Sequence, residues 1–198
     1  LRKHWSGKKA SAPTLEKKHD KYFLRFTYAE EVSLNRTPVK EQTICSVDLG
    51  INTDAVCTIM RPDGTILGRK FINFPSDKDR MYRVLGRIRR FQREHGSRQA
   101  QGRWAYAKRL NTELGRKIAR EIVLYASEKK ADVIVFEYLE MKGKLSGKKK
   151  QKLQMWRKRD IQKRCGQQAH RKGIRISRIC AWNTSCLLYT SPSPRDTR

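Results

Sequence analysis

An excess of basic residues is the feature that most limits what this chain can fold into. Its 198 residues include 46 lysines and arginines against 19 aspartates and glutamates, which gives a formal net charge of +27 at pH 7. Leucine, isoleucine, valine and phenylalanine together number 42. That is just above the proportion at which a highly charged chain stays disordered. The sequence therefore predicts a modest hydrophobic core and a polyanionic partner that relieves the repulsion among the basic residues.

Nucleic acid is the polyanion that this composition favours. The basic residues are spread through segments with helical apolar periodicity, which argues against a disordered basic tail. Four tryptophans and seven tyrosines lie among them and suit base stacking. The apolar stretches are far shorter than the ~20 residues that cross a bilayer, so we expect no membrane partner. Five cysteines without CxxC spacing indicate a reducing, cytoplasmic setting, and we expect those outside residues 186–198 to be small buried residues.

The apolar pattern predicts an α/β domain that follows a short β-hairpin at residues 13–33. Ser76 and Asp79 resemble a capping box at the start of the first helix. The order β-β-β-α-α-β-α-β predicts a mixed sheet with flanking helices. We expect strands at 44–50, 55–60 and 65–71, helices from residue 76 to 91 and from 104 to 130, a strand at 133–136, a basic helix at 153–172 and a strand at 174–176.

Two acidic residues stand out because each ends an apolar strand. Asp48 follows the first strand of the domain and Glu137 follows the fourth. If these strands are neighbours, the two carboxylates meet at one sheet edge and repel each other unless a divalent cation lies between them. Mg²⁺ or Mn²⁺ bound there could activate water for phosphodiester hydrolysis. The alternative is that Asp48 begins a turn and Glu137 is a solvated strand end.

Three segments carry a resemblance to a known family: Asp48-Leu49-Gly50-Ile51-Asn52, then Val135-Phe136-Glu137-Tyr138-Leu139 with Lys142-Gly143-Lys144, and Asn183-Thr184-Ser185. The first two resemble the first and second RuvC motifs of the TnpB (OrfB-type) RNA-guided nucleases of insertion sequences, which are related to the type V CRISPR effectors. The third resembles the segment that leads into their third motif. This resemblance implies an RNase H-like fold, guide RNA and target DNA as partners, and DNA cleavage through two Mg²⁺ ions. It also implies that Asp48 and Glu137 are catalytic metal ligands.

The resemblance also implies a domain organisation. Residues 1–42 resemble the C-terminal remnant of a β-rich wedge domain and its linker, and residues 43–185 resemble a RuvC domain that ends before its third motif. In the family a third carboxylate and a four-cysteine zinc ribbon follow, so zinc is expected in the parent protein and this chain alone is expected to be nearly inactive. Residues 186–198 look like a translated sequencing adapter, with a native Ser/Pro-rich tail as the alternative.

Two basic segments are predicted to bind phosphate. Residues 142–172 hold thirteen lysines and arginines against one acid, and the first helix carries four arginines beside its apolar stripe. The alternative for both is a solvated face. The expected phosphate-binding residues are Lys142, Lys144, Lys148, Lys149, Lys150, Arg157, Lys158, Arg159, Arg83, Arg87, Arg90 and Arg93.

Two other functions remain open. A basic nucleic-acid-binding module could keep the sheet without catalysis, and a transposase could join strands with the same carboxylates. The sequence does not determine whether water or a 3′-hydroxyl attacks. It also does not separate TnpB from a type V effector, or define the guide, the target-adjacent motif or the oligomeric state.

Overall fold

Two compact units make up the chain, Leu1–Ser33 and Leu34–Arg198. The computed structural model describes residues 11–96, 98–138 and 157–180. The connector at 34–42, which the sequence groups with the hairpin, belongs to the second unit, where the Asn35 N–H donates to the Gly173 carbonyl (2.8 Å). The domain names themselves stay predictions.

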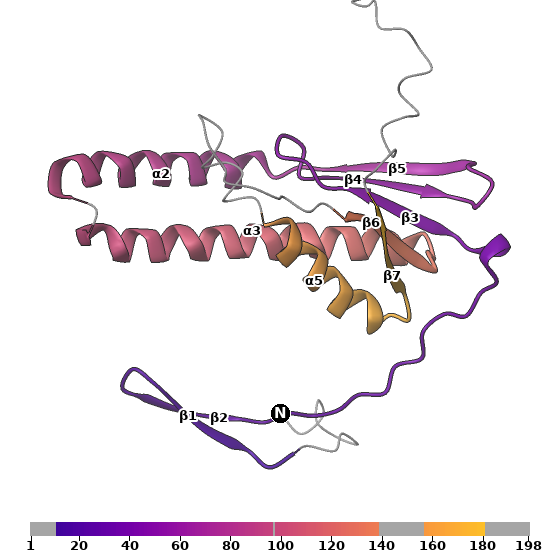
Figure 1. Ribbon diagram of the computed structural model, residues 1–198, viewed down its shortest axis with the longest axis horizontal. Helices are drawn as coiled ribbons and strands as arrows, with labels where there is room; N and C mark the ends of the chain where they lie inside the picture. Colours follow the sequence, from indigo (N-terminus) through magenta and orange to yellow (C-terminus); the bar gives the residue numbers. More distant parts are fainter. Residues whose placement is uncertain (1–10, 97, 139–156, 181–198) are drawn as a thin grey trace, which may run out of the picture. The chain divides into compact units, whose positions relative to one another are not determined.

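The first unit contains the predicted hairpin. Strands β1 (Thr14–Lys18) and β2 (Lys21–Arg25) pair antiparallel (Figure 1). Leu15 lies opposite Leu24, and both are more than 60 % exposed. Since a lone two-stranded hairpin is only marginally stable in water, this unit draws little stability from its own side chains.

A five-stranded mixed sheet forms the second unit, as predicted. Strands β3 (Ile44–Asp48), β4 (Ala55–Met60) and β5 (Ile66–Ile72) form an antiparallel meander. Strands β6 (Val133–Tyr138) and β7 (Arg175–Cys180) add in parallel, which gives the order β5-β4-β3-β6-β7. Strand β3 is therefore central, with the meander on one side and the parallel strands on the other (Figure 1).

The helices are α2 (Pro75–His95), α3 (Gln101–Glu128) and α5 (Lys158–His170), with short 3₁₀ turns at Val39–Glu41 and Arg98–Ala100. The first four residues of the predicted 153–172 helix lie outside the described residues. The capping-box prediction is wrong, because α2 begins after Phe74 without a side-chain cap. None of the described helices combines the length and apolar character that a membrane crossing requires.

Among the described residues, the core lies on one face of the sheet. Alternate residues of the central strands point at α3 and α5, which is why Val47, Ile134 and Phe136 are at most 2 % exposed. Helix α3 meets them with residues such as Ile122, and α5 with Ile161. A second, smaller apolar cluster joins α2 to the N-terminal half of α3, which together extend beyond the sheet as a helical hairpin (Figure 1).

Three of the cysteines belong to this core. Cys45, Cys57 and Cys165 are fully buried, as predicted, whereas Cys180 on β7 is exposed, so the prediction is wrong for that residue. A hydrogen bond with Cys57 and burial raise the pKa of the Cys45 thiol, and burial raises that of Cys165. These thiols are therefore protonated and poorly nucleophilic.

Thiol labelling tests this core. In a Cys186→Ser background, we expect an aromatic disulfide reagent to modify Cys180 at once in the native protein. The other three thiols should react only after unfolding, because they are fully buried. All four must react in strong guanidinium as a control, and rapid native labelling of more than one thiol would contradict the packing described.

Candidate functional site

The parallel pairing of β3 with β6 brings the two predicted metal ligands together. The register aligns Val47 with Phe136, so the following residues, Asp48 and Glu137, lie side by side. Neighbouring strands are about 4.8 Å apart, which is close enough for two carboxylates to share a cation. The first and fourth strands of the domain are neighbours, which is the condition under which the two carboxylates meet at one edge. The role of the two acids stays a prediction.

Both acids point away from the helices. They alternate along their strands with Val47 and Phe136, which face the core, so Asp48 and Glu137 occupy the opposite face of the sheet. Asp48 is exposed and Glu137 is half-buried. Burial of the carboxylates is therefore not the reason to expect a cation at this edge. The reason is the proximity of two like charges.

Local contacts hold both strand ends in place. The Gln162 side chain on α5 donates to the Glu137 carbonyl (3.1 Å). On the other strand, Gly50 begins a tight loop in which a Cβ would lie 2.6 Å from the Thr53 carbonyl oxygen. Only glycine allows the backbone to approach itself this closely directly after Asp48.

Two further acids have structural roles. Asp54 is 6 % exposed, accepts from the Phe74 N–H (2.8 Å) and pairs with Lys78 (3.0 Å). It therefore ties the start of β4 to the start of α2. Asp132 accepts from the Thr43 N–H (2.8 Å) and ties β6 to β3. The sequence signal shared by the two is an acid within one residue of an apolar strand.

The pair of acids fits a cation whose remaining ligands are water and substrate. Within the described ranges, no group of three or more His, Cys, Asp or Glu side chains could hold a metal ion. Mg²⁺ keeps several waters and is commonly held by one or two carboxylates together with substrate phosphates. Asp48 and Glu137 fit that arrangement, whereas a full set of ligands for two metals is not present in the described part of the chain.

The predicted phosphate-binding residues differ in placement. Arg83, Arg87, Arg90 and Arg93 are all exposed on α2, as is Arg159 at the start of α5. Their exposure suits contact with phosphates, although it does not test it. The remaining lysines of the prediction lie outside the described residues; they are Lys142, Lys144, Lys148, Lys149 and Lys150.

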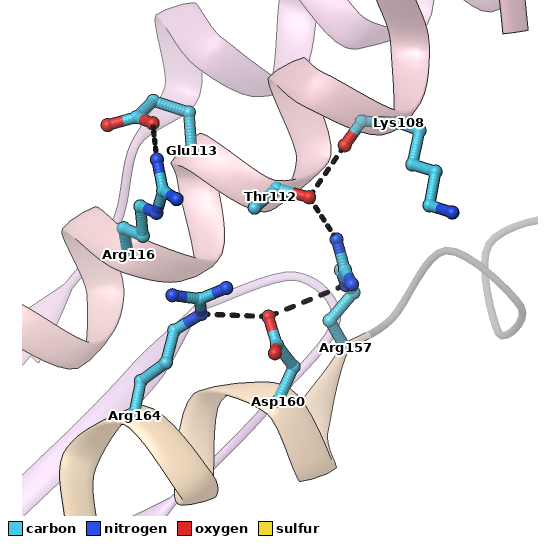
Figure 2. Close-up of polar contacts among 7 residues, drawn as sticks. All are labelled: Lys108, Thr112, Glu113, Arg116, Arg157, Asp160 and Arg164. Atoms are coloured by element: carbon cyan, nitrogen blue, oxygen red, sulfur yellow. Dashed lines mark hydrogen bonds and ion pairs between the residues drawn. The ribbon is translucent and has the colours of Figure 1, made fainter. Parts of the chain in front are cut away.

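Arg157 and Lys158 point into the protein. Figure 2 shows Arg157 bonded to the Thr112 hydroxyl of α3, with its Nε 3.6 Å from the Asp160 carboxylate, which also accepts from Arg164 (3.0 Å). Lys158 is 6 % exposed, and burial, together with the nearby Arg159, lowers its pKa. Phosphate binding by these two residues stays a prediction, and their placement argues against it.

A cavity on the helix side of the sheet was not predicted from the sequence. It has a volume of about 580 Å³ and lies between the loop after β3, helices α2 and α3, and the start of α5. Its lining includes Tyr82, Leu85, Arg89, Leu114 and Arg157. These residues come from three separate helices, so no local pattern could have grouped them.

Two glycine substitutions test the loop that follows Asp48. We expect Gly50→Ala to lower the free energy of unfolding by about 1–3 kcal/mol, because the new methyl group would collide with the Thr53 carbonyl. The matched Gly86→Ala in α2 meets nothing within 4 Å and should raise it by about 0.5–1 kcal/mol. Urea unfolding followed by circular dichroism measures both, and equal effects would contradict the tight loop.

Comparison with known proteins is informative at the level of structure. No protein-family model matches the chain, and no curated protein does either. Among solved structures, a Cas12f1 chain in a complex with sgRNA and target DNA matches with a TM-score of 0.56 and 18 % identity, over 86 % of this chain and 42 % of that one. A chain of a CRISPR-Cas12f ternary complex matches with a TM-score of 0.57 and 17 % identity, over 87 % of this chain and 35 % of that one.

At these identities the likeness shows the fold. The chain spans less than half the length of the two Cas12f chains that it matches. The predicted class, an RNase H-like mixed sheet with flanking helices, is confirmed by the sheet described above and by these neighbours.

Proposed function

We propose that this chain is part of an RNA-guided DNA endonuclease of the TnpB type, in which Asp48 and Glu137 bind Mg²⁺ or Mn²⁺. The observation that carries this proposal is the register of β3 against β6, which places two acids from distant parts of the chain side by side. Outside a metal site, two carboxylates in this position repel each other with no compensating gain.

Guide RNA and target DNA are the partners that we propose. The structural neighbours are complexes of Cas12f chains, one of them with sgRNA and target DNA. The net charge of +27 is what a protein that neutralises many phosphates requires. The four exposed arginines of α2 are the described residues best placed for such contacts.

The residues of this chain would divide the work as follows. Asp48 and Glu137 hold the divalent cation, which when bound supplies an activated water and stabilises charge on the phosphodiester. Because Asp48 is exposed, a substrate phosphate can reach the edge of the sheet without a rearrangement of the core. Gln162 and the loop at Gly50 keep the two strand ends in register.

A non-catalytic nucleic-acid-binding module is the second candidate. It is favoured by one observation, namely that the described residues contain no cluster of three potential metal ligands. The basic surface would then bind nucleic acid, and the two acids would have no cation.

Alanine substitution at the two acids separates these functions. We expect Asp48→Ala and Glu137→Ala each to weaken Mn²⁺ binding at least ten-fold by isothermal titration calorimetry, because each removes one of two protein ligands. Affinity for a DNA or RNA oligonucleotide, measured without metal, should change less than two-fold. Glu113→Ala, at an exposed acid on α3, is the matched control.

The opposite result is equally clear. If Mn²⁺ binds the double variant Asp48→Ala/Glu137→Ala as tightly as the wild type, the two acids are not ligands. The binding module then becomes the better account. A loss of both metal and oligonucleotide binding would instead indicate that the variants do not fold.

A further inference from the structure

One face of α2 combines cationic, aromatic and apolar side chains in a line. Lys78, Tyr82, Leu85 and Arg89 are spaced four, three and four residues apart, so they follow one side of the helix, and all four line the cavity. Tyr82 is 70 % exposed, which leaves most of its ring available to a ligand. None of the four was among the residues expected to bind phosphate.

The opposite walls of the cavity are apolar with one fixed cation. Helix α3 contributes Leu114 and Ile118, and α5 contributes Ile161. Arg157 lies at the start of α5, where Thr112 and Asp160 hold its guanidinium (Figure 2). The walls contributed by α3 and α5 are thus mainly apolar, with Arg157 as their basic residue.

Three basic side chains (Lys78, Arg89 and Arg157) and two acids (Asp54 and Asp79) line the cavity, and Arg89 is the cation most available to an anionic ligand. Lys78 is engaged by Asp54 (3.0 Å), and Arg157 is shared with Asp160. Arg89 is exposed, and its Nε donates a 3.4 Å hydrogen bond to the Leu85 carbonyl of its own helix. At about 1.5 Å of rise per residue, Arg89 lies about 10 Å along the axis from Tyr82.

A flat apolar group joined to an anion fits this arrangement, and a nucleotide is such a group. Aromatic side chains beside cations are how proteins bind single strands without sequence preference, because every base has a face to stack. A volume of about 580 Å³ admits one small ligand and not a duplex. A peptide with an acidic and an apolar side chain is the competing occupant, but the basic character of the whole chain favours the polyanion.

We propose that this cavity binds one unstacked nucleotide of a single-stranded nucleic acid, with its base against Tyr82 and a phosphate at Arg89. The proposal rests on the nucleic-acid binding proposed above, and it adds a site for a single strand on the helix side of the sheet. Gly50 and Asn52, in the loop that follows Asp48, line the same cavity.

The test compares stacking with charge. The full chain is titrated in EDTA into a fluorescein-labelled 15-nucleotide single strand, a duplex of the same sequence, and a strand in which every base is replaced by an abasic site. Fluorescence anisotropy measures each Kd. The variants are Tyr82→Ala, Tyr82→Phe and Arg89→Ala, with Phe71→Ala as a matched control, since Phe71 is a similarly exposed aromatic (66 %) on β5.

We expect Tyr82→Ala to weaken single-strand binding about ten-fold, and Tyr82→Phe to stay within two-fold because the ring remains. Wild type should prefer the normal strand to the abasic strand, and Tyr82→Ala should lose most of that preference. Arg89→Ala should reduce the slope of log K against log salt by about one, which Tyr82→Ala should not do. Duplex binding should be the same for wild type, Tyr82→Ala and Phe71→Ala.

The outcomes that overturn the proposal differ from those that overturn the proposed function. If the strand binds but Tyr82→Ala behaves like Phe71→Ala, or weakens the duplex and the abasic strand equally, the cavity is not a nucleotide site. If no oligonucleotide binds at all, the cavity proposal and the proposed function both fail. Matching circular dichroism melts for Tyr82→Ala and wild type establish that the variant is folded.

Discussion

The parallel pairing of β3 with β6 is the contact on which the rest of the structure depends. It joins a strand near residue 45 to one near residue 135, after a meander and a helical hairpin have intervened. The helices packed on one face of these strands form the core, while the strand ends carry the two acids. Asp132 reinforces the pairing through the Thr43 N–H, so the same register serves both stability and the candidate site.

A one-sided core explains how such a basic chain can fold. The buried residues are concentrated where α3 and α5 cover the sheet, and many of the described lysines and arginines lie on exposed helix surfaces. The opposite face keeps apolar side chains in view, among them Phe71 at 66 % and Ile179 at 42 % exposure. The two acids share that face.

The sequence was informative wherever a short pattern determined the outcome. Short apolar runs located the strands, and the acid after two of those runs singled out Asp48 and Glu137. It failed where the outcome depended on contacts between distant segments. Arg157 and Lys158 belong to a basic run, but both turn inward. Arg157 does so because Thr112 and Asp160 bond its guanidinium. Lys158 is buried in the first turn of α5. At the start of α2 the predicted capping box does not form. Instead Asp54, twenty residues upstream, accepts a hydrogen bond from the Phe74 N–H.

The central claim is that Asp48 and Glu137 share one divalent cation. Anomalous X-ray diffraction from crystals of this chain grown with Mn²⁺ and a short single strand tests it most directly. The account predicts an anomalous peak between the two carboxylates, within about 2.5 Å of an oxygen of each. A peak at another site, or none beside these residues while the strand is bound, would contradict it.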